Sequence, residues 1–175
     1  MPISPVTITD GLFAHLSLPE GLRAVTGAAL DPAALAELRA EAMRPSLEAV
    51  GRFDPERVRR RFLDGFDAQA TLAVYEGAGL VGFLVLRTRP DHLYLDHLYI
   101  APVAQGRGLG AVLLRAVQAQ IAMPLGQDIR LIALTGSPSG RFYQREGFVL
   151  TGSDGIDDAY IWTCPPDAAP VTAAR

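Results

Sequence analysis

Three glycines spaced two residues apart, Gly106, Gly108 and Gly110, constrain this chain more than any other feature of its sequence. An apolar run over residues 93–100 precedes them, and residues 105–123 carry apolar side chains at the spacing of one helix face. The segment therefore predicts a strand, a short loop and a helix that begins among the glycines. Glycines let a backbone approach a ligand closely, and a helix N-terminus attracts anions, so this loop is suited to a phosphate or pyrophosphate.

Apolar, turn and capping residues predict the remaining strands and helices. Strand character marks seven segments: residues 22–26, 71–75, 80–86, 93–100, 129–135, 148–151 and 159–163. Besides residues 105–123, helices are expected after three capping pairs: Asp31-Pro32, Asp54-Pro55 and Ser137-Pro138. The almost wholly apolar run 129–135 is typical of a strand buried on both faces. This order predicts an α/β domain with one mixed sheet and excludes a helical bundle or a β-sandwich.

The size and charge of the chain limit its domains and partners. With 175 residues, 49% of them hydrophobic, and a net charge of −3, it has material for one domain. We expect that domain at residues 21–163, between an N-terminal extension (1–20) and a C-terminal tail (164–175). No segment approaches the ~20 apolar residues of a membrane span, and no basic region precedes a signal-like segment. We therefore expect no membrane partner and a cytoplasmic location. We also expect no nucleic-acid partner, because nucleic-acid binding needs a basic face and this chain has a net negative charge.

Missing residue types narrow the possible chemistry. The sequence contains no Lys, which excludes lysine Schiff-base chemistry and a Walker-type phosphate loop. Its one cysteine, Cys164, can form neither an intramolecular disulfide nor a multi-cysteine metal site, and the histidines lack metal-ligand spacing. We expect no metal.

A dinucleotide-binding fold is the first alternative for the glycine segment. Gly106, Gly108 and Ala111 fit its fingerprint, and Asp128 lies 20 residues after Gly108. In that fold the acidic residue ends the second strand, whereas Asp128 precedes the expected strand 129–135. We therefore reject a nucleotide-dependent oxidoreductase.

A second motif downstream points to a different family. The two segments read Leu98-x-Ile100-x-Pro102-x-x-Gln105-x-x-Gly108-x-Gly110 and Arg141-Phe142-Tyr143-Gln144-Arg145-Glu146-Gly147-Phe148. With the order of elements over residues 21–163, this pair resembles the GNAT (Gcn5-related) N-acetyltransferase family. The resemblance implies a single mixed, mostly antiparallel central sheet flanked by helices, the GNAT-like acyl-CoA N-acyltransferase fold.

The resemblance also implies the reaction and the cofactor. Family members transfer an acetyl group from acetyl-CoA, the cosubstrate, to an amine, here a primary amine of a small molecule or peptide. Their pantetheine arm adds like a strand to the backbone before the glycine loop, and the loop amides hold the pyrophosphate. Ten residues are therefore expected to bind the cofactor: Leu98, Tyr99, Ile100, Gln105, Gly106, Arg107, Gly108, Leu109, Gly110 and Ala111. The closing strands often mediate dimers in this family, so a homodimer is a further expectation.

Tyr143 is the expected catalytic acid, because it matches the family tyrosine that protonates the CoA sulfur. A phenol has an ordinary pKa near ~10 and is protonated at neutral pH. The alternative is a packing role beside Phe142 and Phe148. A direct attack by the amine needs no covalent intermediate, and no Ser or Cys stands in a nucleophile motif.

The catalytic base has more than one candidate. Strand alternation places Tyr94, Asp96, Leu98 and Ile100 on one face of the strand and His97 on the other, with Leu95 and Tyr99. Family bases commonly match Tyr94 and Asp96, so Asp96 is the expected base. His97 has the better intrinsic pKa and becomes the alternative if a bulge, which this family has on this strand, turns it. A reaction without a dedicated base is the third possibility.

One position departs from the family. An asparagine often lies near the start of the tyrosine helix, whereas this chain has Gly136-Ser137-Pro138-Ser139. Ser137 can cap the helix but lacks the paired donor and acceptor of an amide. The alternative function is therefore a non-catalytic acyl-CoA-binding regulatory module.

Overall fold

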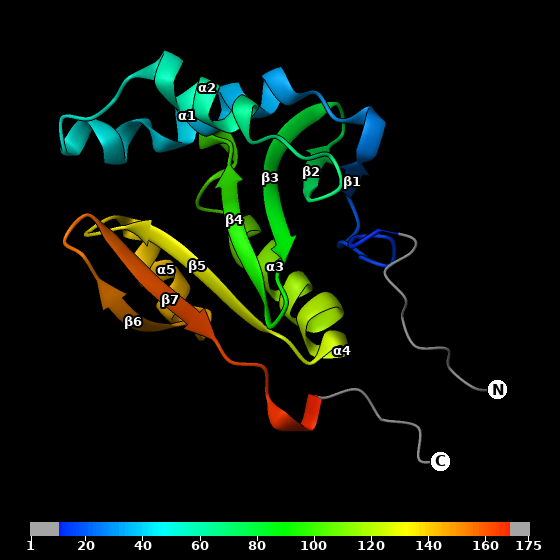
Figure 1. The fold of residues 1–175 in the computed structure, drawn as a ribbon. Helices are drawn as coiled ribbons and strands as arrows, with labels where there is room; N and C mark the ends of the chain where they lie inside the picture. The colour runs from blue at the N-terminus through cyan, green and yellow to red at the C-terminus, as the bar shows by residue number, and fades with distance from the viewer. Residues whose placement is uncertain (1–10, 169–175) are drawn as a thin grey trace, which may run out of the picture.

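A computed structural model describes residues 11–168 of the chain and contains one seven-stranded sheet (Figure 1). Its strands are β1 (Leu22–Thr26), β2 (Thr71–Glu76), β3 (Gly79–Thr88), β4 (His92–Ile100), β5 (Asp128–Leu134), β6 (Val149–Ser153) and β7 (Asp157–Trp162). They lie in the order β1-β2-β3-β4-β5-β7-β6, and every neighbouring pair is antiparallel except β4 and β5. The mixed, mostly antiparallel sheet expected from the sequence is confirmed.

The helices follow the expected order. They are α1 (Pro32–Ala49), α2 (Pro55–Asp64), α3 (Leu109–Val117), α4 (Met123–Leu125) and α5 (Pro138–Arg145). Asp31 caps α1 by accepting hydrogen bonds from two backbone amides, each at 3.1 Å. Asp54 caps α2 by accepting one, from the amide of Arg57 at 3.1 Å. Ser137 occupies the expected N-cap position of α5, but its hydroxyl pairs with that of Ser139 and makes no capping hydrogen bond to the helix backbone. Within residues 11–168 no helix is both long and apolar enough to cross a membrane.

The helix expected over residues 105–123 begins later and ends later. A short 3-10 turn, Pro102–Ala104, follows β4, and the positive φ of Gly106 and Gly108 delays the regular helix to Leu109. Pro124 does not stop the helix, since a π-helical turn, Gln118–Ala122, precedes α4.

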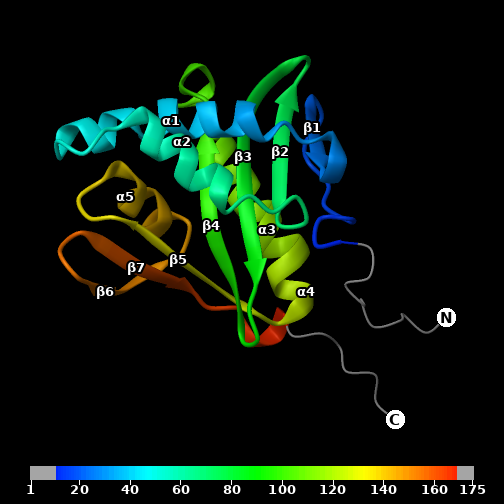
Figure 2. The same ribbon diagram turned by 45° about the horizontal axis from the view of Figure 1, so that its top comes forward.

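The helices lie in two layers around the strands. Figures 1 and 2 show α1 and α2 on one face of β2, β3 and β4, with α3 on the other. The core between the layers contains Phe62, Phe83, Leu84, Leu93, Leu113 and Leu114.

β5 differs from the strand expected at residues 129–135. Ile129 and Leu131 are buried, but Arg130 and Ile132 are exposed. The expectation that this strand is buried on both faces is wrong, because β5 lies beyond the reach of α1 and α2 (Figure 1). The first half of the expected N-terminal extension, residues 1–10, and residues 169–175 of the tail lie outside the described part of the chain. From residue 11 onward, Phe13 packs into the core.

Candidate active site

The sheet opens between its two parallel strands. β4 and β5 pair only at His92↔Asp128, Leu93↔Ile129 and Tyr94↔Arg130. Beyond this point β5 pairs with β7 and the two parallel strands diverge, as Figure 1 shows. The edge of β4 that faces β5 is therefore unpaired after Tyr94 within residues 11–168.

The open edge of β4 presents backbone groups to the gap. The amide of Ala101 donates to the carbonyl of Val81 on β3 at 2.9 Å. Because backbone groups alternate along a strand, Tyr99 directs its amide and carbonyl toward β3, and Leu98 and Ile100 direct theirs into the opening. The Gln105 side chain donates to the Ile100 carbonyl at 3.0 Å, which ties the start of the glycine loop to the end of β4.

The glycine loop lies at this end of β4. Gly106 and Gly108 have φ angles of 77° and 78°, and a Cβ at either would meet no atom within 4 Å. Their backbone is therefore open to a ligand at the N-terminus of α3, where the helix dipole favours an anion. Arg107 forms a two-point ion pair with Glu76, at 2.7 and 3.0 Å. Its guanidinium is thus partly neutralised by the chain itself.

A β-bulge changes which β4 side chains face α1 and α2. His97 pairs with Val85 and Leu95 pairs with Leu86, so Asp96 is the extra residue. The expected alternation, with His97 and Tyr99 opposite Asp96, is wrong for this reason. The His97 ring packs on Phe62 of α2 at 5.4 Å, so it lies on the same side as Asp96.

Side chains beyond His97 follow the bulge as well, as Tyr99 and Ile100 show. The hydroxyl of Tyr99 contacts the sulfur of Met43 on α1 at 3.3 Å, so Tyr99 faces the helix pair. Ile100 faces α3, where its side chain lies 3.8 Å from the Cβ position of Gly110.

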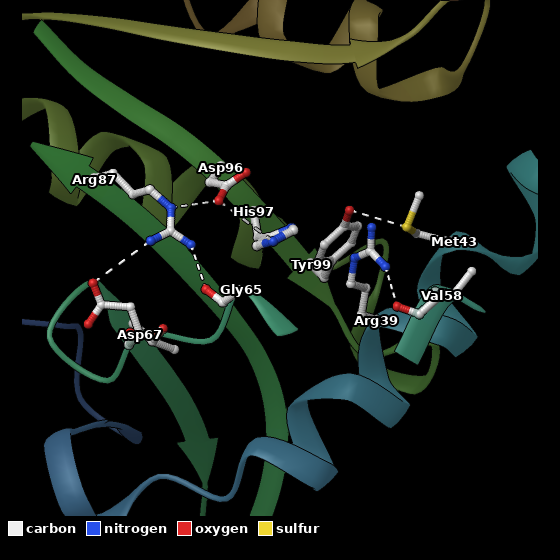
Figure 3. Close-up of polar contacts among 10 residues, drawn as sticks. Arg39, Met43, Val58, Gly65, Asp67, Arg87, Asp96, His97 and Tyr99 are labelled. Carbon is white, nitrogen blue, oxygen red and sulfur yellow. Dashed lines mark hydrogen bonds and ion pairs between the residues drawn. The ribbon is translucent and has the colours of Figure 1, made fainter. Parts of the chain in front are cut away.

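Asp96 is held by a cation. Its Oδ2 accepts a hydrogen bond from Arg87 Nε at 2.7 Å (Figure 3). Arg87 also donates to the Gly65 carbonyl, just after α2, at 2.9 Å and lies 3.8 Å from an oxygen of Asp67. The carboxylate is therefore fixed between β4 and the end of α2, with His97 Nε2 at 3.9 Å from its Oδ2.

His97 is a weaker base than its type suggests. Burial lowers its pKa to about 4, and Asp96 opposes this shift only in part. The guanidinium groups of Arg39, Arg87 and Arg61 lower the pKa further. The imidazole is therefore neutral at pH 7, and its buried Nδ1 has no hydrogen-bond partner in the described chain.

Tyr143 comes from α5 and lies inside an aromatic cluster. Its ring packs against Phe142, Phe148 and Tyr160 with centroid distances of 5.1, 5.6 and 6.2 Å, and only 8% of the residue is exposed. Burial raises the pKa of its phenol, and the phenol of Tyr99 adds to the rise. The group therefore keeps its proton at neutral pH and can donate it.

The structure adds Arg39, which the sequence reading did not single out. Arg39 is only 6% exposed, and its Nη1 donates to the Val58 carbonyl at 2.6 Å. A signal was present, because Arg39 stands one turn after Leu35 in the apolar stripe that continues to Ala42 and Met43. A charge within such a stripe indicates a buried polar site.

A shallow cavity of about 400 Å³ lies beside Tyr94, along β5 and β7. It is lined by His92, Tyr94, Arg130, Leu131, Ile132, Thr151, Ala159, Tyr160 and Ile161. Residues 11–168 contain no group of three or more His, Cys, Asp or Glu side chains placed to hold a metal ion.

A mixed sheet that opens between β4 and β5 beside a glycine loop defines the acyl-CoA N-acyltransferase fold. Three solved structures illustrate the likeness. PH1933 from Pyrococcus horikoshii is 20% identical with a TM-score of 0.64, and the match covers 82% of this chain and 99% of that one. An acetyltransferase from Thermus thermophilus is 22% identical with a TM-score of 0.59, over 84% and 97% of the two chains.

The third structure was solved with coenzyme A. This PaiA N-acetyltransferase from Thermoplasma acidophilum is 17% identical with a TM-score of 0.59, over 81% of this chain and 98% of that one. The sequence of residues 36–164 matches the family described as acetyltransferase (GNAT) domain. The chain therefore belongs to the GNAT acetyltransferase family. Among curated proteins, none matches the sequence.

Proposed function

We propose that the protein acetylates a primary amine of a small molecule or peptide, with acetyl-CoA as the acetyl donor. The observation that carries the proposal is the opening between β4 and β5, with an anion-suited loop at the end of β4. Acetyl-CoA supplies an activated thioester, which a neutral amine attacks without a covalent enzyme intermediate. The residues around the opening have the properties that this reaction requires.

The chain fits the two polar parts of the cofactor. The loop amides from Gln105 to Ala111, at the start of α3, suit a pyrophosphate, since the positive φ of Gly106 and Gly108 leaves their backbone uncovered. The free backbone of Leu98 and Ile100, with Tyr99 between them, suits the amides of an extended pantetheine arm. The Ile100 carbonyl already accepts from Gln105, so its amide remains the free group at that residue.

Tyr143 is the proposed acid. Its raised pKa keeps Oη protonated at neutral pH, so the hydroxyl is available as a donor to the negative charge that develops on the leaving sulfur. The hydroxyl would give this proton to the sulfur.

Asp96 is the proposed base, acting directly or through one water. It would take the proton that the amine must lose, while Arg87 keeps the carboxylate oriented. The exposure of the two side chains favours this assignment, because the Asp96 side chain is 28% exposed and that of His97 only 15%. His97 is better suited to packing between Phe62 and Tyr99.

Tyr143→Phe tests the proposed acid, because it preserves the ring and removes only the donor. We expect turnover, measured as thiol release from acetyl-CoA, to fall by about 10²-fold or more. The affinity for acetyl-CoA, measured by calorimetry, should stay within a few-fold. Equal losses of affinity and turnover would make Tyr143 a cofactor contact and not an acid.

Asp96→Asn tests the proposed base. Raising the pH deprotonates the amine without help, so the rate defect of this variant should recover in alkaline solution. A defect of equal size at every pH would show that Asp96 positions the acceptor and takes no proton.

A further inference from the structure

Arg39 carries a buried charge that the described chain leaves without a counter-ion. It projects from α1 toward β4 with 6% of the residue exposed, and no carboxylate of residues 11–168 lies within ion-pair distance. One hydrogen bond, from Nη1 to the Val58 carbonyl, accounts for only one of its five donors, and Nε has no partner. Burying an unpaired charge is costly, so such a group usually has an anionic partner.

A second donor beside Arg39 is also poorly satisfied. The Cζ atom of Arg39 lies over the Tyr99 ring, 5.8 Å from the ring centroid. The Tyr99 hydroxyl donates its hydrogen bond to the thioether sulfur of Met43 at 3.3 Å (Figure 3). A thioether is a weak acceptor, and an unbranched methionine side chain moves easily. The Arg39 guanidinium also acts on the Tyr99 hydroxyl, where it opposes the rise in pKa that burial causes. Within residues 11–168 the acceptors at this place are therefore a carbonyl, a phenol oxygen and a thioether, and none is a carboxylate.

The charges on this side of β4 also favour an anion. Three guanidinium groups, those of Arg39, Arg87 and Arg61, act on the His97 ring. Two carboxylates lie near them, those of Asp96 and Asp67, and both are against Arg87. Arg87 is already paired with Asp96, so the local excess is positive although the whole chain has a net charge of −3.

We infer that the acceptor amine also carries a carboxylate, which Arg39 and Tyr99 bind while the amine faces Asp96. This inference rests on the proposed function and deepens it, since it names the chemical class of the acceptor. Asp96 and Tyr99 are three residues apart on β4, which corresponds to at most about 10 Å along a strand, since the bulge at Asp96 shortens the rise. An acceptor that reaches both places has several bonds between its amine and its carboxylate.

Matched pairs of acceptors test the inference. The probes are ω-amino acids from glycine to 6-aminohexanoate, each compared with its carboxamide, which keeps the amine and removes the negative charge. Thiol release from acetyl-CoA gives kcat/KM for each. We expect the wild-type protein to prefer the longer carboxylates over their carboxamides by about ten-fold or more, mainly in KM, as for a charge-assisted hydrogen bond.

Variants of α1 assign that preference to Arg39. Arg39→Met should reduce the carboxylate-to-carboxamide ratio to near one, and Arg39→Lys should retain part of it because the charge remains. Arg44→Met, which removes an exposed guanidinium from the same helix, should leave the ratio unchanged. Calorimetric titration of 6-aminohexanoate into the CoA-loaded protein should show binding that Arg39→Met abolishes.

Three outcomes would overturn the inference. Equal kcat/KM for the wild-type protein on carboxylates and carboxamides would refute it while leaving amine acetylation intact. Equal losses for both series in Arg39→Met and Arg39→Lys would make Arg39 a structural tie between α1 and α2. If no amine of either series releases thiol, the proposed function fails. In that case the inference is tested by calorimetry alone, and equal binding of 6-aminohexanoate and its carboxamide would refute it.

Discussion

Gly140 lies in α5 at a point where even a methyl group has no room. A Cβ built at this residue would lie 2.6 Å from the hydroxyl oxygen of Tyr160 and 3.5 Å from its Cζ. The Tyr160 ring is 5% exposed and packs against Tyr143, so it has little freedom to move away. The hydroxyl oxygen alone is therefore the obstacle, since 3.5 Å is an ordinary contact distance.

The two opposing energies can be separated by a double-mutant cycle. Replacing glycine by alanine inside a helix normally stabilises it by about 0.8–1.0 kcal/mol, whereas overpacking a core costs about 1–3 kcal/mol. We expect Gly140→Ala to destabilise the wild-type protein by about 1 kcal/mol. In the Tyr160→Phe background the same change should stabilise by up to about 1 kcal/mol, because the obstructing oxygen is gone.

Urea unfolding of the four proteins measures these values from the midpoints at a common m-value. Turnover should follow the same pattern, because Gly140 stands one turn before Tyr143 on α5. If Gly140→Ala stabilises both backgrounds equally, the packing of α5 against Tyr160 described here is incorrect.

Three further predictions concern the loop, the bulge and a helix cap. Gly108→Val should strongly weaken acetyl-CoA binding, measured by calorimetry, because the valine side chain would project into the open loop at a φ of 78°. Unchanged affinity in a folded variant would refute the assignment of this loop to the cofactor. The pKa of His97 is about 4 in the folded protein and 6.5 in the unfolded chain. The contribution of the neutral imidazole to the free energy of unfolding is therefore complete above pH 6.5 and is lost as the pH falls toward 4, because in this range the unfolded chain binds a proton that the folded protein does not. The loss should reach about 3 kcal/mol and should shrink in His97→Gln, measured by urea unfolding at several pH values. Asp31→Ala should destabilise the protein by about 1 kcal/mol in the same assay, since it removes the cap of α1, and a change near zero would contradict that role.

Much of the fold follows from local signals in the sequence. Asp31 and Asp54 mark the starts of α1 and α2 because an aspartate followed by proline both caps and preorganises a helix. Gly106 and Gly108 require backbone conformations that other residues avoid, so the position of the loop could be predicted. The order of strands and helices follows from these boundaries.

The features that failed prediction depend on tertiary pairing. Alternation along β4 breaks at Asp96 because β3 pairs with it through a bulge, which no residue type in the strand requires. The exposed face of β5 depends on where α1 and α2 lie, not on the composition of β5. The burial of Arg39 was visible in the helix period, but its lack of a counter-ion depends on the surrounding side chains.

The central claim, that this protein moves an acetyl group to an amine, is tested most directly by incubating the full chain with acetyl-CoA and a panel of primary amines. Free thiol and the mass of the acceptor are measured together. The account predicts amine-dependent thiol release that equals the amount of N-acetylated product. Tight binding of acetyl-CoA without amine-dependent thiol release would contradict it and would identify the chain as an acyl-CoA-binding module.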